Sequence, residues 1–559
     1  MTRPGDHHSD GGCILPAEDE PHPVVVFHNG RMLTMERGAP PDATVLVTRG
    51  GRIEAVGGRE LLQRYPHASH VDLAGCWLCP GFIDAHNHLS IAALHPLWAD
   101  LSAVRNEEEL ANVLRAQAAR DPHAPWVRGA NWNEVETGLL PDRRMLDRIG
   151  LDRPILIAHY TLHQGVVCSR GLDELGIGRS TPDPPGGMIA RDWEGNPSGL
   201  LVERAWSEAH ARSVMPYRDR DRHDDWIVER AQLLLAEGIT CVHDAACPPA
   251  AEQAYWRLAR SNRLPISVLV MPHAEAILRG QDPQRWHGPP TGEGDEWLRV
   301  GPMKFFADGG IAPALDVCAA GIRMQMGMEF TDLQAELERA VAHGFRVAVH
   351  AIGNAGLERA LSSFAEIRRR NPSADLRFRV EHACLASEEQ LRRLRELGGV
   401  AVVQPGFLHH LGEAVLEVRF DNATWLPFGT MMEIGLPLAA SSDDPCALRP
   451  PLLTASYGAS RRTASARILD PSEAVPYEEW LRAYTIGAAY AGGQEHERGS
   501  LAPGKRADLV VLHGELDSMA PPRVVQTWVA GKLGWGELAP LADAGHFRVP
   551  VSAPGSDTL

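Results

Sequence analysis

The sequence predicts an α/β protein built on a (β/α)8 barrel of the TIM type. Eight short apolar segments follow one another across most of the chain, and most of them are separated by helical patterns. Several of these segments end in histidine or aspartate. Short β segments joined by turns occur at both chain ends and predict a small β-sandwich domain. A long stretch after the first barrel strand predicts a large insertion.

Composition limits the class of protein. The 559 residues exceed one average domain, and 44% hydrophobic with 23% charged residues is typical of a globular protein. The formal charge of −17 argues against binding to nucleic acid or to an anionic membrane. The first 16 residues lack an apolar signal segment, and no run long enough to span a membrane occurs. Nine scattered cysteines fit reduced thiols, so we expect a cytoplasmic protein.

The two chain ends are expected to form one domain. Residues 1–21 are polar and are predicted to be disordered. Residues 22–75 contain β segments joined by turns such as Asn29-Gly30, a pattern typical of hairpins. A similar β pattern returns in residues 496–550. We therefore predict that these two segments pair, with the barrel, residues 76–495, inserted between them.

The barrel strands and helices are predicted from apolar runs and helical periodicity. The strand before the first two candidate histidines is expected at residues 77–83. The insertion, residues 90–230, is expected to form a lid or a pocket wall. The other seven strands are predicted at residues 239–244, 266–271, 300–308, 346–350, 378–382, 400–404 and 436–441. Helices are predicted at residues 107–119, 224–237, 333–343, 356–370 and 388–397.

The first candidate site is a pair of histidines after the first barrel strand. His86 and His88 are two positions apart, so on a strand they point to the same face. Two imidazoles at one strand end can bind one metal ion. For this pair alone, ordinary polar residues at a strand end are an equally good interpretation.

Polar residues at other strand ends extend this site. A single histidine at a strand end is more often structural, and an aspartate before a proline can form a turn. Lys304 lies inside an apolar run, where a buried ammonium is costly unless it is paired or neutralised. Because barrel strands end at one mouth, these residues are expected to converge there, and imidazole with carboxylate suits zinc. The polar residues are His243, Asp244, Lys304, Asp308, His350, His382, Asp443 and Asp444.

Several motifs together resemble a known family. The chain is similar to the amidohydrolase superfamily, and within it to the amidohydrolase-3 (YtcJ-like) group, which includes N-substituted formamide deformylases. The resemblance covers nearly all of the chain after about residue 22 and implies the barrel and small β domain predicted above. The motifs that carry it lie at residues 80–88, 186–200, 304–309, 349–353, 379–382, 404–405, 442–445 and 499–512.

The resemblance implies a role for each candidate ligand. His86 and His88 would bind a first metal, and His350 and His382 a second one. Lys304 would be carboxylated and would bridge both metals, which would also remove the problem of its buried charge. Asp443 would be a first-metal ligand and the catalytic proton carrier. The implied cofactor is one or two divalent ions per chain, and Zn²⁺ suits the ligands best.

The implied reaction is hydrolysis of a non-peptide carbon–nitrogen bond in a small molecule, of the amide, N-formyl or cyclic amide type. His163 could donate a hydrogen bond to the developing oxyanion, although a structural loop histidine is as good an interpretation. The insertion offers further candidates for substrate contact, with purely structural roles as the alternative. They are Trp132, Asn133, Arg191 and Asp192.

Other functions remain open from the sequence. The same centre could hydrolyse an ester, a lactone or a C–Cl bond. A mononuclear enzyme with an unmodified Lys304 is a further alternative. A barrel of this superfamily could also serve as a non-catalytic assembly protein, although the complete ligand set argues against that role. The substrate, the metal and the oligomeric state are not determined by the sequence, and a homo-oligomer is compatible with it.

Overall fold

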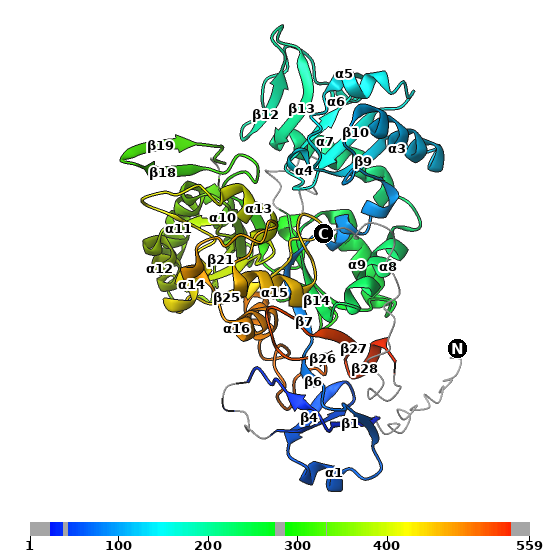
Figure 1. The fold of residues 1–559 in the computed structure, drawn as a ribbon, viewed down its shortest axis with the longest axis vertical. Coiled ribbons are helices and arrows are strands. Elements are labelled where there is room, and N and C mark those ends of the chain that lie inside the picture. The colour runs from blue at the N-terminus through cyan, green and yellow to red at the C-terminus, as the bar shows by residue number, and fades with distance from the viewer. Residues whose placement is uncertain (1–22, 37, 39–42, 274–284, 331–332, 538–559) are drawn as a thin grey trace, which may run out of the picture.

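The computed structural model of the chain centres on a ring of parallel strands with helices around it (Figure 1). This ring confirms the predicted TIM-type barrel. The predicted disordered tail, residues 1–21, lies outside the residues that the structure describes. The described residues are 23–36, 38, 43–273, 285–330 and 333–537.

The barrel strands follow one another around the ring in sequence order, each parallel to its hydrogen-bonded neighbours. Each lies within a few residues of its predicted position. The strands are β7 (Phe82–Asn87), β14 (Ile239–Cys247), β15 (Ser267–Pro272), β16 (Leu298–Val300) with β17 (Met303–Phe306), β20 (Val347–Ala351), β21 (Arg379–His382), β23 (Val400–Val403) and β25 (Leu438–Ala440).

Backbone hydrogen bonds join the last strand to the first. The N–H of Asp443 donates to His86 O at 2.8 Å, and the N–H of His88 donates to Asp444 O at 2.9 Å. The predicted fourth strand, residues 300–308, is divided into β16 and β17, because Pro302 between them has no N–H to donate. These bonds place the residues after β7 and after β25 side by side at one mouth.

The prediction of one strand over residues 77–83 is wrong. β6 (Trp77–Pro80) pairs antiparallel with β26 (Leu509–His513), outside the ring, and β7 begins only at Phe82. Gly81 separates the two strands. A Cβ at this position would lie 2.2 Å from Thr240 Oγ1, so the close approach of β14 requires glycine.

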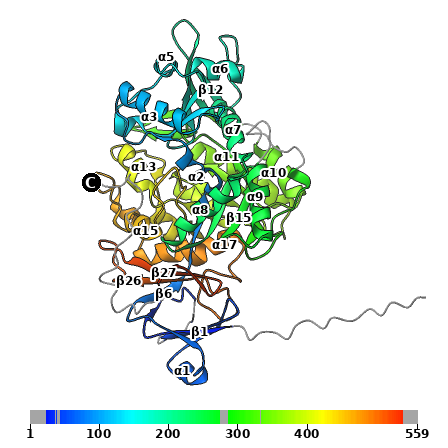
Figure 2. The ribbon, with the colours of Figure 1, turned by 90° about the vertical axis from the view of Figure 1, so that its right-hand side faces the viewer.

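Two small sheets lie below the barrel in Figures 1 and 2. One has the order β4-β3-β1-β5, and the other, β2-β6-β26-β27-β28, joins strands from both ends of the chain. Phe27 and Trp528 pack edge to face between them, with ring centroids 4.9 Å apart. The remaining strands are β1 (Val24–His28), β2 (Arg31–Met32), β3 (Val45–Arg49), β4 (Arg52–Gly57), β5 (Ser69–Asp72), β27 (Arg523–Val529) and β28 (Lys532–Gly536).

The segment between β7 and β14 lies at the opposite end of the molecule from the small sheets (Figures 1 and 2). It contains a six-stranded sheet of order β12-β13-β11-β10-β9-β8 with helices packed on it. Its elements are β8 (Ala99–Asp100), α3 (Glu107–Arg120), β9 (Val127–Trp132), α4 (Glu134–Thr137), α5 (Arg143–Arg148), β10 (Ile155–His159), β11 (Gln164–Val167), α6 (Ser169–Leu175), β12 (Gly187–Arg191), β13 (Pro197–Glu203) and α7 (Arg204–Arg218).

The outer helices bury one apolar face against the ring. In α11, for example, Leu357, Leu361 and Phe364 are three or four positions apart and all belong to the barrel core. Among the described residues, no helix is long and apolar enough to cross a membrane. The barrel helices are α8 (His223–Leu235), α9 (Pro249–Arg260), α10 (Leu333–Ala342), α11 (Asn354–Arg370), α12 (Glu388–Glu396), α13 (Phe407–Val415), α14 (Phe428–Glu433), α15 (Pro451–Ser460), α16 (Tyr477–Arg482) and α17 (Ala488–Gly492). A projecting hairpin of β18 (Leu315–Ala319) and β19 (Ile322–Met326) follows β17.

Candidate metal centre

A cavity of about 160 Å³ opens at the carboxyl ends of the barrel strands. It collects all six residues that the sequence predicts as metal ligands, from five different strands or the loops that follow them. Part of its wall comes from the insertion, through the loop after β10 and helix α7. The predicted ligands that line it are His86, His88, Lys304, His350, His382 and Asp443.

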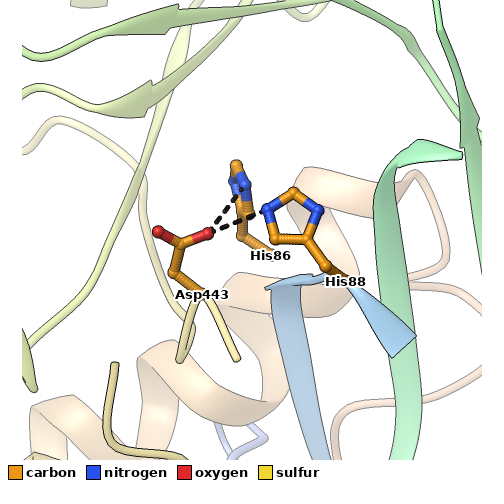
Figure 3. A group of neighbouring side chains, drawn as sticks. All are labelled: His86, His88 and Asp443. Carbon is orange, nitrogen blue, oxygen red and sulfur yellow. Dashed lines mark hydrogen bonds and ion pairs between the residues drawn. The ribbon is translucent and has the colours of Figure 1, made fainter. Parts of the chain in front are cut away.

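Three of these residues point at one another, as Figure 3 shows. Ligand atoms of His86, His88 and Asp443 all lie within 4.8 Å of one another. Asp443 Oδ1 is 3.1 Å from His88 Nε2 and 3.4 Å from His86 Nε2. Two imidazole nitrogens and a carboxylate oxygen around one point form a donor set that suits a divalent cation.

Hydrogen bonds on the far side of each ring orient these histidines. Nδ1 of His86 lies 2.5 Å from Glu381 Oε2, and Nδ1 of His88 lies 2.9 Å from Ala245 O. His382 uses Nδ1 in the same way, at 2.9 Å from Gln404 Oε1. Because each Nδ1–H faces an acceptor, Nε2 keeps its lone pair, which is the arrangement of a metal-binding imidazole.

A second group of candidate ligands lies beside the first. The rings of His350 and His382 have centroids 4.6 Å apart, and His382 is 4.8 Å from His86. Nε2 of His350 is buried without a hydrogen-bond partner in the described part of the chain. Burial lowers the pKa of His382 to about 3, so this ring is neutral, as metal ligation requires.

Lys304 and Asp443 carry the titratable charge of the cavity. Lys304 is 1% exposed, and burial lowers the pKa of its ammonium to about 8. Burial alone would raise the pKa of Asp443. The contact with His88 and the positive charge of Lys304 instead hold this pKa below its usual value, so Asp443 is a carboxylate at neutral pH.

The other polar residues at strand ends have structural partners. Asp308 accepts N–H bonds from Ala314, Ile352 and Gly353, and burial raises its pKa to about 8. Asp444 forms an ion pair with Arg230 at 2.6 Å. These contacts fix the loops at the barrel mouth.

Of the predicted substrate contacts, His163 reaches the cavity, and Trp132 and Arg191 do not. His163 lines the cavity, and its Nδ1 lies 2.7 Å from Glu203 Oε2. Trp132 does not reach the cavity, because it packs in the core of the insertion and donates Nε1–H to Leu139 O at 3.0 Å. Arg191 does not reach it either, since its guanidinium donates to backbone carbonyls in the loop before β12.

Asn133 and Asp192 also have local roles. Asn133 caps α4 by accepting from Val135 N–H at 3.1 Å. Asp192 accepts from the N–H groups of Glu194 and Asn196 in the turn between β12 and β13. Asp192 therefore has the purely structural role that was the alternative to substrate contact.

Two carboxylates of this site were not predicted. Glu381 lies in the barrel interior, where it accepts from Arg379 as well as from His86. A signal existed, because Arg379 and Glu381 are two charged residues on one face of a buried strand and have to pair. Glu203 has φ of 51° where β13 meets α7, and it accepts from Ile311 N–H at 2.9 Å.

Comparison with known proteins agrees with this site. A family model described as "Amidohydrolase family" matches residues 70–533. The chain is 32% identical over 516 residues to the N-substituted formamide deformylase of Arthrobacter pascens, covering 88% of this chain and 94% of the relative. It is 28% identical to a protein named as an amidohydrolase, YtcJ, of Bacillus subtilis strain 168, covering 89% and 96% of the two chains.

Solved structures agree with the fold. An uncharacterized metal-dependent hydrolase from Pyrococcus horikoshii OT3 aligns with a TM-score of 0.70 at 24% identity, covering 88% of this chain and 98% of the other. A similar protein from Pyrococcus furiosus aligns with a TM-score of 0.67 at 24% identity, covering 88% and 99%. At this identity the likeness supports the barrel fold alone.

Proposed function

Because the chain belongs to the amidohydrolase family, we propose that it is a metal-dependent hydrolase that cleaves a non-peptide carbon–nitrogen bond in a small molecule. The bond would be of the amide, N-formyl or cyclic amide type. The observation that carries this proposal is the convergence of His86, His88 and Asp443 at the barrel mouth. The similarity to a formamide deformylase over most of both chains supports the choice of bond.

The cavity residues fit a binuclear site. His86, His88 and Asp443 would hold one ion, and His350 with His382 the other. Nε2 of His350 is buried, lies 3.7 Å from Asp308 Oδ1 and has no hydrogen-bond partner among the described residues, which favours a ligand role. Lys304 would be carboxylated and would lie between the ions. A buried ammonium beside four histidines is unfavourable, whereas an anionic carbamate between two cations is favourable. Zn²⁺ suits this donor set best.

Asp443 would carry the proton during hydrolysis. A bound metal would supply an acidified water and polarise the substrate carbonyl. Asp443 is ionised at neutral pH and can accept the proton of the attacking water, then return it to the leaving nitrogen. Burial alone would lower the pKa of His163, but the Glu203 carboxylate raises it overall. The ring can therefore carry a proton on both nitrogens and donate from Nε2–H to the oxygen that gains charge.

The cavity limits the substrate to a small molecule. Its volume of about 160 Å³ is close to that of a cavity that accepts one benzene ring. We further propose that the insertion, residues 90–230, acts as the wall that excludes water from this cavity. The two small sheets would form one β-sandwich domain, and the pairing of β6 with β26 supports this grouping.

A substrate panel with metal analysis tests the proposal. Full-length protein would be loaded with Zn²⁺, Mn²⁺ or Fe²⁺ and assayed on matched N-formyl amines, amides, ureas and esters. We expect carbon–nitrogen hydrolysis, and a loss of about 10³-fold or more in kcat for Asp443→Asn with metal still bound. The exposed Asp152→Asn is the matched control. Hydrolysis of esters alone, or activity that survives Asp443→Asn, would contradict the proposal.

A further inference from the structure

Helix α7 forms one wall of the cavity and presents polar residues to it. Ser207, His210, Ala211 and Arg218 all line the cavity. Positions 207, 211 and 218 lie on one face of the helix, because they are four and seven residues apart. The insertion therefore contributes a cationic side chain, Arg218, to the same space as the candidate metal ligands.

Arg218 has no carboxylate partner in the described part of the chain. No hydrogen bond or ion pair joins its guanidinium to a described residue, and its Nε is buried without an acceptor. Asp244 is a nearby carboxylate, but it accepts from Tyr255 Oη at 2.9 Å and from Ser90 N–H. Arg218 therefore faces the cavity with hydrogen-bond donors to spare.

A second buried arginine adds positive charge behind it. Arg128 is 0% exposed, lies over the Trp98 ring, and contacts Ser213 Oγ and His210 Nδ1. None of these partners is a carboxylate. Burial lowers the pKa of Arg128 to about 9, and the positive charge of Arg218 makes a smaller contribution in the same direction.

Two other arginines at this end of the barrel have carboxylate partners. Arg230 contacts Asp444 at 2.6 Å, and Arg449 contacts Glu237 at 2.5 Å. Burying cations without a counter-charge is unfavourable, and here the cavity is the route by which a counter-charge can arrive. We name Arg218, with Arg128 behind it, the cationic recess.

We propose that the cationic recess binds a carboxylate of the substrate, so that the protein hydrolyses small amides that carry a negative charge. This inference rests on the proposed function and names its substrate class. A guanidinium matches a planar carboxylate through two parallel hydrogen bonds. Arg204 and Arg218 both line the cavity, and we assign the carboxylate to Arg218, because Arg204 donates to Pro185 O. One guanidinium suits a singly charged group, and the cavity volume leaves space for little more than one ring.

Ligand binding to the zinc-loaded, full-length protein tests the recess without any turnover. Phenylacetate, its neutral isostere phenylacetamide, and acetate would be titrated by calorimetry. We expect phenylacetate to bind at least about tenfold more tightly than the other two. This preference should disappear in Arg218→Met and persist in part in Arg218→Lys. Arg212→Met, an exposed position on the same helix, should leave it unchanged.

The outcomes separate the recess from other anion sites. Equal binding of phenylacetate and phenylacetamide would overturn the proposal. A preference that survives Arg218→Met would place the carboxylate elsewhere, for example on the metal, and would also overturn it. Acetate binding as tightly as phenylacetate would indicate a site for free anions rather than a substrate anchor. Zinc content and melting temperature show whether Arg218→Met is folded. If it is not, the preference for phenylacetate is measured in Arg218→Lys instead.

Hydrolysis assays distinguish this inference from the proposed function. If no amide is hydrolysed while phenylacetate still binds through Arg218, the recess stands and the proposed reaction is wrong. If neutral and carboxylate-bearing amides are hydrolysed with equal kcat/KM, the reaction stands and the recess is wrong. The second result would be checked with Arg218→Met, which should then have no effect on either substrate.

Discussion

Glu381 Oε2 lies 2.5 Å from Nδ1 of His86, although the two residues are on β21 and β7, which are not neighbouring strands of the barrel. Both side chains are buried, and Arg379 contacts the same carboxylate. The orientation of the His86 face that would bind a metal is therefore set from inside the barrel. A carboxylate behind a ligating imidazole fixes the ring and raises its basicity.

Replacing this carboxylate should weaken the metal site. Glu381→Gln keeps the shape of the side chain but removes the charge that holds His86 and neutralises Arg379. We expect a 10- to 100-fold lower zinc affinity, measured by competition with a chelator. The exposed Glu396→Gln on α12 is the control. An unchanged affinity would mean that His86 is not a ligand or is held by other contacts.

Lys304 should determine how many metal ions bind. If a carboxylated Lys304 bridges two ions, Lys304→Ala should retain at most one ion per chain, measured by elemental analysis. The parent should hold two, and its mass should include the carbamate. Lys532→Ala, at an exposed position, should behave like the parent. Two ions remaining in Lys304→Ala would rule out the bridging role.

The positions of the candidate ligands could be predicted from the sequence because barrel geometry is regular. His86, His350, His382 and Asp443 each stand at or near the end of a strand segment, and Lys304 lies inside an apolar run. Parallel strands in a ring all end at one mouth. The candidate ligands can therefore be placed at one mouth without knowing the structure of the loops. The same regularity also explains why errors in strand boundaries, such as the division at Gly81, did not displace the site.

The insertion could not be interpreted in the same way. Trp132 and Arg191 have the residue types of substrate contacts, yet one packs in a local core and the other binds carbonyls of its own loop. Arg218 gives the opposite case. In sequence it is an ordinary basic residue in the last turn of a helix, where arginine is common. Only the packing of α7 against the barrel shows that it lines the cavity.

Acid should destabilise the protein partly through His223. This ring is 1% exposed, and burial, with Arg218, lowers its pKa to about 4. The unfolded chain takes up the proton near pH 6.5 and the folded chain only near pH 4, so stability is lost as the pH falls between these values. We expect His223→Gln to flatten the dependence of the unfolding free energy on pH by about 1–3 kcal/mol over this range.

Chemical denaturation at several pH values measures this effect. His123→Gln, an exposed histidine before β9, is the control and should leave the slope unchanged. The comparison uses slopes, so a constant loss of stability in either variant does not affect it. A His223→Gln slope equal to that of the parent would show that the pKa of this histidine is not lowered by folding.

His163 and Glu203 should act as one unit. Glu203 Oε2 is 2.7 Å from His163 Nδ1, and the same carboxylate accepts from Ile311 N–H. Without the carboxylate the imidazole loses its orientation, and without the imidazole the carboxylate has no catalytic effect. His163→Asn and Glu203→Gln should each lower kcat/KM by about 10²-fold, and the double variant by little more than either, because residues that share one interaction are not additive. Zinc content should stay constant in all three, which separates this effect from loss of the metal. Losses that multiply to about 10⁴-fold would show that the two side chains act independently and that Glu203 only stabilises the loop.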